Sequence, residues 1–375
     1  MSALRAEEFP WAEDRVYLNH ASTGPLPRRA HDRVADFNRR RARMEGMSDE
    51  LLHGILAGSR RRIARLVGAD PAEIALAGNT SWGLNLAAAC LPLEPGDVVV
   101  VSDREFPANV YPWMRLAHRG VVCELAPATA RGWPDEDRLV DRMQDPGVRV
   151  VAVSWVQFST GYRVDLARLG RAARASGTYL VVDAIQGLGQ LPLDLSRVPI
   201  DILSCGAQKW LLSPWGTGFV YVRRDLITQL HPGVTGWMAH RGTDDFSRLT
   251  AYDGALHDDA RRFELVTLPF QDFVGLNASL DLLLELGDAR IAEHVDRVTE
   301  PLRMWAEAAG VRLTSPAGTS RSGIVCVAPP GVAGAFQRLV DGGVVASLRE
   351  GSIRLSPHCY STVGEMERVV ELLRG

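Results

Sequence analysis

Lysine is almost absent from this chain of 375 residues. Only one of its 42 lysine and arginine residues is a lysine, at position 209. GC-rich coding can replace dispensable lysines by arginine, so the survival of this one is informative. Any chemistry that requires a side-chain amine must use Lys209.

Cysteine is too sparse and too scattered to build a framework. The five cysteines are odd in number, widely spaced, and never form a Cys-x-x-Cys pair. This pattern argues against disulfides and against a structural zinc site. The histidines and acidic residues also lack convincing metal-ligand spacing. We therefore expect no bound metal and a reducing, cytoplasmic setting.

Basic runs and long apolar runs are missing as well. The formal net charge is -3, so the chain lacks the positive charge that is typical of proteins that bind nucleic acid. The first eleven residues contain no apolar core of a signal peptide, and no apolar run is long enough to span a bilayer. The expected partners are small molecules and further copies of the chain, rather than nucleic acid or a membrane.

Short apolar runs alternate with amphipathic stretches along most of the chain. Runs rich in valine and isoleucine predict buried strands at Ile74–Ala77, Val98–Val101, Val148–Val153, Tyr179–Val182, Ile202–Cys205 and Phe219–Val222. Helical patterns lie between several of them, at Trp82–Cys90, Val110–His118, Glu136–Met143 and Leu166–Ala175. This alternation predicts an α/β fold with a mostly parallel central sheet flanked by helices.

The two ends of the chain follow other patterns. Tyr17–Pro27 is rich in turn formers and predicts an irregular loop, so we expect residues 1–25 to form an N-terminal active-site loop segment. Helical patterns at Arg29–Met44 and Glu50–Leu66 open a large domain over residues 26–270. Two long helical stretches and a short α+β tail then predict a small C-terminal domain over residues 271–375.

Lys209 follows the strand Ile202–Cys205 by a few residues. A lysine just past a buried strand end can be partly desolvated, which lowers its pKa and makes it a usable nucleophile. A surface lysine in a loop is the alternative. Only the scarcity of lysine in the chain favours a catalytic role for Lys209.

Asp183 ends the strand Tyr179–Val182, and Gln186 lies on the turn that follows. Polar groups at the carboxyl ends of parallel strands face the ligand crevice. A carboxylate in such a place needs a cationic partner, and a protonated pyridine nitrogen would serve. A helix-capping role for Asp183 is the alternative.

Two further turns carry candidate ligand contacts. Thr80 and Ser81 begin a predicted helix, where free N–H groups and two hydroxyls suit a phosphate. Phe106 follows the next strand and could stack on an aromatic ring. An ordinary helix cap and core packing are the respective alternatives. His20, in the N-terminal segment, is a candidate substrate contact or simply a polar loop residue.

Together these segments resemble the class-V aminotransferase and cysteine desulfurase group of fold-type I enzymes, which use pyridoxal 5′-phosphate (PLP). The resemblance covers nearly the whole chain, and kynureninase and isopenicillin N epimerase are among the relatives it suggests. It rests on the order and spacing of Tyr17–Ser22, Asn79–Gly83, Glu105–Trp113, Val182–Gly187, Gln208–Leu211, Arg262–Pro269 and Gly351–His358.

The resemblance implies a role for each candidate around PLP. The implied cofactor contacts are Thr80, Ser81, Phe106, Asp183, Gln186, Gln208, Lys209 and Thr267. Lys209 would bond covalently to the cofactor and shuttle protons, while Asp183 would pair with the pyridinium nitrogen. Gln186 would hydrogen-bond near the ring oxygen, and Phe106 would stack on the ring.

The remaining implied roles concern the phosphate, the partner subunit and the substrate. Thr80, Ser81 and Gln208 would hold the phosphate. Thr267 would reach the phosphate of a neighbouring subunit, which implies a homodimer with shared active sites. Arg354 would clamp the substrate carboxylate, a bidentate task that suits arginine. A surface arginine on an edge strand is the alternative for Arg354.

Departures from the family pattern guide the choice of reaction. Gln208 replaces the usual histidine, and Phe158 stands where desulfurases have asparagine. The segment 329–343 before Arg354 contains no cysteine, although a desulfurase needs a thiolate there to accept sulfur. We therefore expect β-elimination from a cysteine S-conjugate or a related amino acid.

Four alternatives to β-elimination remain. Two are other PLP reactions, transamination and epimerisation. The third is an inactive PLP-fold scaffold that binds another protein. The fourth is a nucleotide-binding α/β enzyme, disfavoured because the sequence lacks a complete dinucleotide fingerprint.

Overall fold

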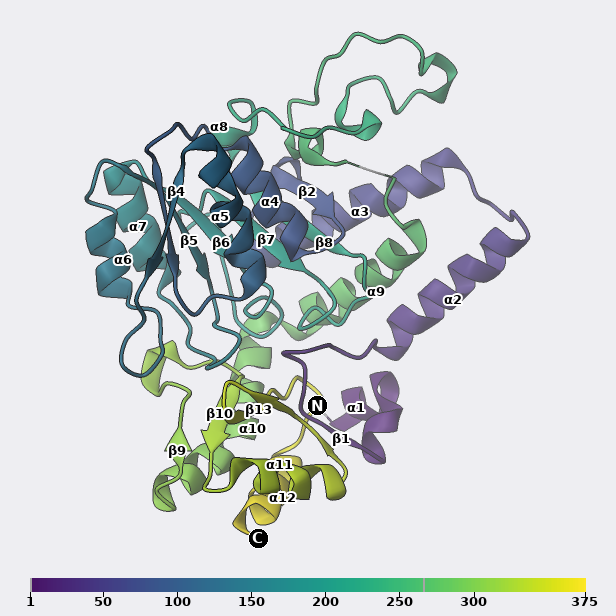
Figure 1. The fold of residues 1–375 in the computed structure, drawn as a ribbon. Helices are drawn as coiled ribbons and strands as arrows, with labels where there is room; N and C mark the ends of the chain where they lie inside the picture. Colours follow the sequence, from purple (N-terminus) through teal and green to yellow (C-terminus); the bar gives the residue numbers. More distant parts are fainter. Residues whose placement is uncertain (1, 266) are drawn as a thin grey trace.

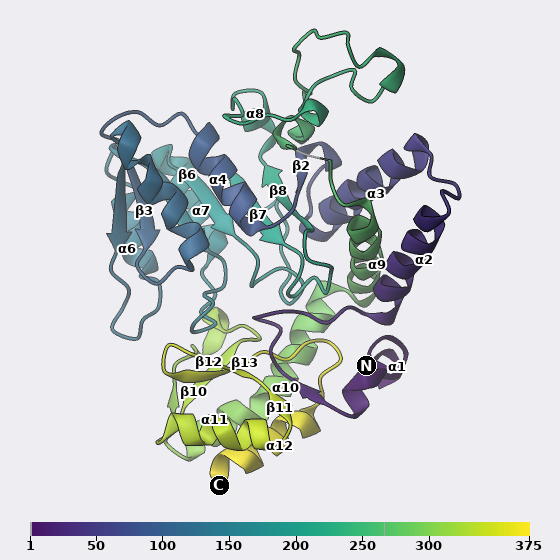
Figure 2. The same cartoon turned by 45° about the vertical axis from the view of Figure 1, so that its right-hand side comes forward.

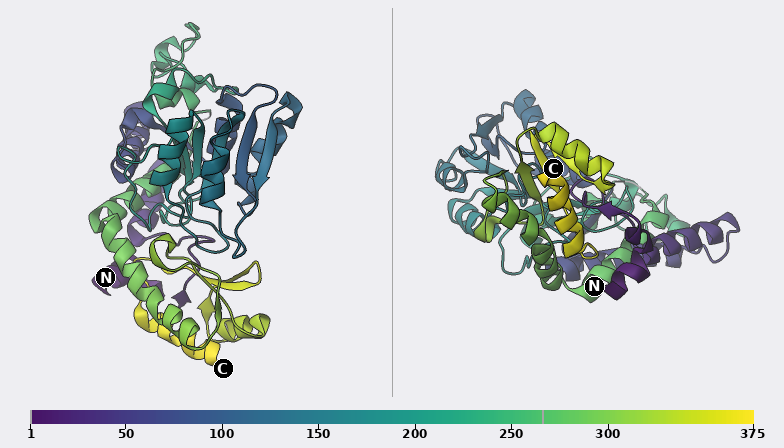
Figure 3. Two further views of the ribbon diagram at one scale, coloured as in Figure 1. Left: turned by 90° about the vertical axis from the view of Figure 1, so that its left-hand side faces the viewer. Right: turned by 90° about the horizontal axis from the view of Figure 1, so that it is seen from below.

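The chain folds into a sheet domain and a smaller domain below it, as Figure 1 shows. The computed structural model describes residues 2–265 and 267–375. A view from below places the small domain in front of the sheet domain (Figure 3). Within the described residues, no helix is both long and apolar enough to cross a membrane.

Seven strands form the central sheet, and the predicted architecture is confirmed. In spatial order they are β2 (Ile74–Ala77), β8 (Gly218–Val222), β7 (Ile202–Gly206), β6 (Tyr179–Asp183), β5 (Val148–Ser154), β3 (Val98–Ser102) and β4 (Val122–Ala126). Strand β8 alone runs in the opposite direction to the other six. All six predicted strands are present. The sequence analysis missed β4, an edge strand whose Val122 and Leu125 are exposed.

The strands are apolar throughout because helices cover both faces of the sheet. On β3, Val100 packs into one core cluster, while Val99 and Val101 pack into a second cluster on the other face. The covering helices include α3 (Asp49–Val67), α4 (Thr80–Cys90), α6 (Glu136–Arg142) and α7 (Leu166–Ser176). Burial on both faces explains why valine runs, rather than alternating patterns, marked these strands.

The predicted helix Val110–His118 is interrupted. A 3-10 turn over Pro107–Asn109 comes first, and α5 (Tyr111–Met114) follows it. A second 3-10 segment, Arg115–Arg119, ends the stretch. Pro112 lies in the first turn of α5, where its missing N–H would be unpaired in any helix, so it allows a helix to begin here. The predicted helix is thus three short pieces.

The small domain is built on a four-stranded antiparallel sheet. Its order is β12 (Ser347–Arg349), β13 (Ser352–Leu355), β10 (Val325–Ala328) and β9 (Arg312–Leu313). One face packs on α10 (Asp288–Ala308), α11 (Val332–Asp341) and α12 (Val363–Arg374). The segment 329–343, which precedes Arg354 and contains no cysteine, consists mostly of α11.

The N-terminus joins the small domain rather than remaining irregular. It contains α1 (Ser2–Glu8), a 3-10 turn over Pro10–Glu13 and β1 (Val16–Tyr17). Strand β1 pairs in parallel with β11 (Val344–Val345). The predicted irregular segment therefore holds short elements anchored on the C-terminal half.

The hydrophobic packing divides later than the predicted domain boundary after residue 270. Helix α9 (Phe270–Leu286) packs on α2 (Arg28–Ala42) and α3. Its Phe273, Leu276 and Leu280 belong to a core cluster of the central sheet. Ile291 and Val295 of α10 still belong to that cluster, and within α10 the separate core of the small domain begins with Val298. The packing therefore changes over within α10, between Val295 and Val298.

One loop ties the two domains together at the carboxyl end of β5. Four consecutive carbonyls of the 157–163 loop accept hydrogen bonds from small-domain side chains, those of Phe158 from Arg354, Ser159 from Cys326, Thr160 from Ser315 and Gly161 from Ser322. The loop therefore fixes the small domain against the end of the sheet.

Replacing Gly161 should weaken this connection. Gly161 has φ of 73°, and an added Cβ would lie 2.4 Å from the carbonyl oxygen of Ile324. Gly177 has a similar φ of 75° but open space around it. Both Gly161→Ala and Gly177→Ala incur the backbone strain, about 1–2 kcal/mol. We expect Gly161→Ala to lose at least about 1 kcal/mol more, because only it adds a clash.

Urea denaturation of the two variants measures this difference. Equal losses of unfolding free energy would show that the contact between the loop and the small domain contributes nothing to stability.

Candidate active site

The candidate site lies where the sheet meets the small domain. Parallel strands β3, β5 and β6 end there, and β5 leads into the 157–163 loop that bonds the small domain (Figure 2). Ligands of open α/β sheets bind at this end of the strands. Asp183 is the last residue of β6, and Lys209 follows the end of β7.

Lys209 has the properties of a reactive amine. Its Nζ lies 5.7 Å from the centroid of the Phe106 ring. Burial lowers the pKa of Lys209 to about 8, although the Asp183 carboxylate opposes this shift. A larger neutral fraction near pH 7 makes the amine more available as a nucleophile or base.

Asp183 is buried with one recorded hydrogen bond to its carboxylate. The residue is 3% exposed, and its Oδ1 accepts a hydrogen bond from the Ile185 N–H at 2.9 Å. Burial raises the pKa of Asp183 to about 6, against the favourable charge of Lys209. A cation against this carboxylate would restore its ionised form, as a pyridinium nitrogen does.

Glu105 is a second buried carboxyl that the sequence analysis did not single out. It accepts hydrogen bonds from the backbone N–H of Ser154 at 2.8 Å, from the Ser154 hydroxyl, and from Asn109 Nδ2 at 3.2 Å. Ser154 lies opposite Asp183 in the sheet. Burial raises the pKa of Glu105 to about 7. Its position just after a buried strand was the available signal.

The start of α4 offers a place for a phosphate. Asn79 caps the helix by accepting from the Trp82 N–H, and Thr80 Oγ1 accepts from the Gly206 N–H at 2.8 Å. Gln208 Oε1 is buried without a hydrogen-bond partner in the described structure. An amide can turn over, which would put two N–H donors in its place.

Gly206 leaves the space that such a group needs. A Cβ on Gly206 would lie 2.6 Å from Gln208 Oε1 and 3.2 Å from Thr80 Oγ1. Any side chain would therefore fill the gap between these polar atoms. An orphaned amide, a helix start and an open cradle fit a phosphate, and Ser81 is exposed in the same first turn. The residues present thus fit PLP.

Arg354 is buried and, among the residues that the structure describes, has no carboxylate partner. It is 2% exposed and donates to Ser347 Oγ at 3.2 Å, to the Phe158 carbonyl at 2.9 Å and to Ser22 Oγ at 2.7 Å. Burial lowers the pKa of Arg354 to about 10. Neutral acceptors hold a guanidinium in place but do not balance its charge, so the site favours an incoming anion.

One aromatic ring, Phe106, lies beside Lys209, and a second, Phe158, packs against it. Phe106 is 45% exposed, as a ring available for stacking must be. The Phe158 ring meets it edge-on, with centroids 5.3 Å apart and planes at 80°. Phe158 therefore touches the candidate stacking residue with its ring and Arg354 with its carbonyl.

His20 lies in the core, which corrects its assignment to substrate binding. Its ring is 0% exposed, and its nitrogens pair with the Ser356 carbonyl at 2.9 Å and the Tyr360 hydroxyl at 3.0 Å. Burial lowers its pKa well below the ordinary value. Both nitrogens are occupied, so the ring cannot reach a ligand.

Two other predicted cofactor contacts are Gln186, whose amide is already hydrogen-bonded within the protein, and Thr267, which is exposed. Gln186 Nε2 donates to the Ala21 carbonyl at 2.9 Å, and its Oε1 accepts from Trp210 Nε1 at 2.8 Å. Only its second N–H remains for a ring oxygen. Thr267 is exposed, as a residue that reaches a partner subunit must be. Both roles stay predictions.

The five cysteines offer no reactive thiol at the site. Four are buried, and Cys123 lies partly buried on the edge strand β4. Cys326, opposite Arg354 in the sheet, donates to the Ser159 carbonyl, and burial raises its pKa to about 11. A buried thiol with a raised pKa is a poor nucleophile.

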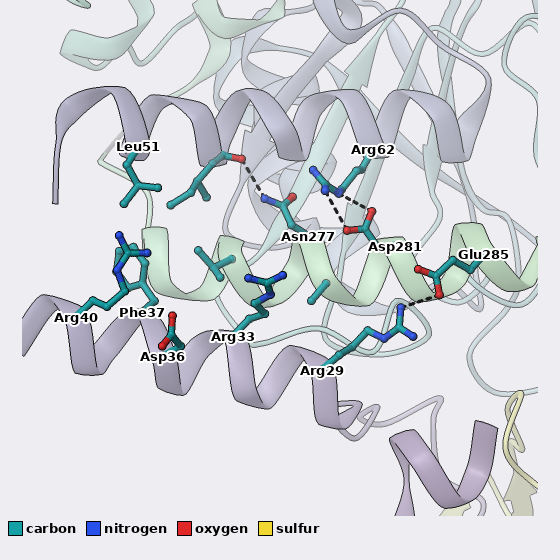
Figure 4. A pocket seen from close by; sticks show the side chains of 13 residues that line it. Arg29, Arg33, Asp36, Phe37, Arg40, Leu51, Arg62, Asn277, Asp281 and Glu285 are labelled. Atoms are coloured by element: carbon teal, nitrogen blue, oxygen red, sulfur yellow. Dashed lines mark hydrogen bonds and ion pairs between the residues drawn. The ribbon is translucent and has the colours of Figure 1, made fainter. Parts of the chain in front are cut away.

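A separate groove of about 550 Å³ lies between α2, α3 and α9. Figure 4 shows Arg62 paired with Asp281, and Arg29 with Glu285, along its walls. Arg33 points into the space without a drawn partner. None of the predicted site residues lines this groove, so it is distinct from the site at Lys209.

Comparison with known families agrees with this geometry. The profile of the family "Aminotransferase class-V" matches residues 16–369. The chain belongs to the class-V aminotransferase family. Members of this family use PLP, so the chain is a PLP-dependent enzyme, as the resemblance predicted.

Individual relatives of this class-V member carry different activities in their names. Isopenicillin N epimerase of Streptomyces clavuligerus is 31% identical, over 96% of this chain and 94% of its own. A probable cysteine desulfurase of Methanothermobacter thermautotrophicus is 33% identical, over 79% and 73%. The aminotransferase YcbU of Bacillus subtilis, whose own function is uncharacterised, is 30% identical, over 84% and 81%.

Solved structures show the same fold. The cystine C-S lyase C-DES in complex with cysteine persulfide superposes with a TM-score of 0.88 at 21% identity, covering 98% of this chain and 99% of that one. The apo cysteine desulfurase of Thermococcus onnurineus gives 0.87 at 22% identity, covering 99% and 96%. These likenesses confirm fold type I, with its mostly parallel sheet and small C-terminal domain.

The buried ammonium should destabilise the cofactor-free protein. The folded pKa of Lys209, about 8, lies below the ordinary value of 10.5. Its penalty is therefore fully present below pH 8 and fades as the pH rises toward 10.5. We expect Lys209→Met to raise the unfolding free energy at pH 7 by roughly 1 kcal/mol, since Asp183 loses a nearby cation and offsets part of the gain.

Lys209→Arg is the matched control, because it keeps a charge at every pH. Denaturation at pH 7 and pH 10 tests the pair. A Lys209→Met variant whose advantage does not shrink at pH 10 would contradict the assignment of this penalty to Lys209.

Proposed function

We propose that the chain catalyses β-elimination from an amino acid with a leaving group on its β-carbon, such as a cysteine S-conjugate. The observation that carries this proposal is a single partly buried amine, Lys209, facing an uncompensated Arg354 with no accessible thiol beside them. Such a site can bind an amino acid and remove its α-proton, but it cannot accept sulfur.

The charged residues of the site bind different groups of the substrate and the cofactor. Arg354 binds the α-carboxylate through its planar guanidinium and replaces the neutral Phe158 carbonyl or Ser22 hydroxyl as it does so. Asp183 would hold a positive charge on the ring nitrogen of PLP, and Phe106 would stack on the ring. Thr80, Ser81 and Gln208 would hold its phosphate.

Bound PLP supplies an electron sink for the pair left when the α-proton departs. Lys209 Nζ takes that proton, and the bond from the β-carbon to its substituent breaks with both electrons leaving on the substituent. The departing thiolate takes a proton. Addition of one water to the remaining fragment gives pyruvate and ammonium.

A desulfurase role is disfavoured by the residues around Arg354. Helix α11 occupies the segment where a mobile cysteine loop would be needed, and a hairpin joins β12 to β13. Burial raises the pKa values of Cys326 and Cys359 to about 11 and 12. Neither thiol can take sulfur from a substrate in this state.

Epimerisation is the second candidate, favoured by the extent of the match to isopenicillin N epimerase. Reprotonation on the opposite face of the α-carbon needs a second proton donor. Burial raises the pKa of Glu105 to about 7, but its carboxyl group is already hydrogen-bonded to Ser154 and Asn109. The described site thus offers one base, which suits elimination better.

A homodimer with shared sites is part of the proposal. The arm over residues 232–259 projects from the sheet domain in Figures 1 and 2. It exposes large apolar side chains, including Trp237, Phe246, Leu249 and Tyr252. Exposed apolar surface of this kind favours association. With Thr267 exposed as well, a second copy would complete the phosphate site.

The reaction is tested by incubating the holoenzyme with a panel of cysteine S-conjugates. We expect pyruvate, ammonia and thiol in equal amounts. Arg354→Gln should lower kcat/KM by about a hundredfold, because it removes a charge-assisted bidentate contact worth roughly 3 kcal/mol. Deuterium exchange at the α-carbon without pyruvate would instead establish epimerisation, and accumulation of the pyridoxamine form would establish transamination.

The covalent anchor is tested by borohydride reduction of the holoprotein, followed by digestion and mass spectrometry. Because the chain has one lysine, the tag should appear on the peptide with Lys209 and nowhere else. Lys209→Ala should bind PLP without becoming tagged. A tag on any other peptide would overturn the assignment of Lys209.

A further inference from the structure

The β12–β13 hairpin brings a second arginine to the site. Glu350 and Gly351 join the strands with φ of 44° and 73°. Two successive positive φ values are typical of the tight turn that fixes the register of a hairpin. In this register Ser347 lies opposite Arg354, and Arg349 lies opposite Ser352.

Arg349 starts from the same face of the sheet as Arg354. Residues opposite each other in an antiparallel pair share a face, and alternate residues along a strand return to it. The hydrogen bond from Arg354 Nε to Ser347 Oγ confirms the shared face. Ile353 points the other way, into the small-domain core. Arg349 and Arg354 are thus diagonal neighbours, with backbones about 7–8 Å apart.

The charge of Arg349 has no acidic partner in the described parts of the chain. Its one side-chain hydrogen bond goes to the Leu348 carbonyl at 2.9 Å. Burial is the main cause of the lowered pKa values of Lys209 and Arg354, but the Arg349 charge adds to both. Arg349 therefore lies within electrostatic reach of the site while remaining exposed at its mouth.

A substrate with a single carboxylate would leave the positive charge of Arg349 without an anionic partner. In the proposed function the α-carboxylate pairs with Arg354, and Asp183 faces the ring nitrogen. One cation at the open end of the site is left without a counterpart. The Phe158 ring, which meets Phe106 edge-on and whose carbonyl accepts from Arg354, suits an apolar spacer between the reacting carbon and that end.

We propose that Arg349 recognises a second carboxylate, at the far end of the substrate side chain. The substrate class is then an amino acid whose β-substituent ends in an anion, such as a carboxyalkyl thioether. This inference rests on the proposed function for the bond that breaks. Arg349 selects the substrate and takes no part in proton transfer.

A pair of ligands that differ in one charge tests the proposal. S-carboxymethyl-L-cysteine and S-carbamoylmethyl-L-cysteine have nearly the same shape. Titrating each into the holoenzyme and following the visible absorption of the bound cofactor gives a Kd, whichever bond breaks later. We expect the wild type to bind the acid about tenfold more tightly, and rising salt to reduce this preference.

Variants assign the preference to Arg349. Arg349→Gln should abolish it, and Arg349→Lys should keep most of it. Arg297→Gln is the matched control, because it removes an exposed arginine paired with Glu293 on α10 and should leave the preference unchanged. Arg349 is exposed, so we expect its variants to fold, and their melting temperatures check this.

Equal binding of the two ligands by the wild type overturns the proposal. So does a preference that survives Arg349→Gln. If the preference depends on Arg349 but no pyruvate forms, the β-elimination is wrong while the role of Arg349 stands. If pyruvate forms from both ligands at equal kcat/KM and equal Kd, the elimination stands and the role of Arg349 is wrong.

Discussion

The cost of removing charges from water is the constraint on which this site depends. Asp183, Lys209 and Arg354 are held where the sheet meets the small domain, and each has a pKa displaced by burial. Their described hydrogen-bond partners are neutral. A ligand that brings a cation to Asp183 and an anion to Arg354 relieves both penalties together. Selectivity for a zwitterionic substrate on a charged cofactor follows from this arrangement.

The fold was predictable wherever one physical rule dominated. Strands buried on both faces must be apolar throughout, so Val98–Val101 and Ile202–Cys205 could be located from sequence alone. The edge strand β4 escaped because solvent on one side permits polar residues such as Glu124. The core that α9 joins was not predictable, because a helix that is apolar around most of its surface does not reveal which of two cores it will pack against.

The site was predictable in its residue types more than in its contacts. The scarcity of lysine singled out Lys209, and strand ends singled out Asp183. His20 was misassigned because a histidine in a turn-rich segment looks the same whether it faces a ligand or the core. Arg349 escaped because its place beside Arg354 depends on the hairpin register, which the sequence does not state.

The 157–163 loop has a further consequence for how molecules enter and leave. Four adjacent carbonyls of the loop accept hydrogen bonds from the small domain, and a hinge motion between the domains would have to break all four bonds together. The two domains should therefore move as one rigid body during turnover. Small molecules would then enter and leave where the hairpin tip at Glu350 and Gly351 borders the solvent.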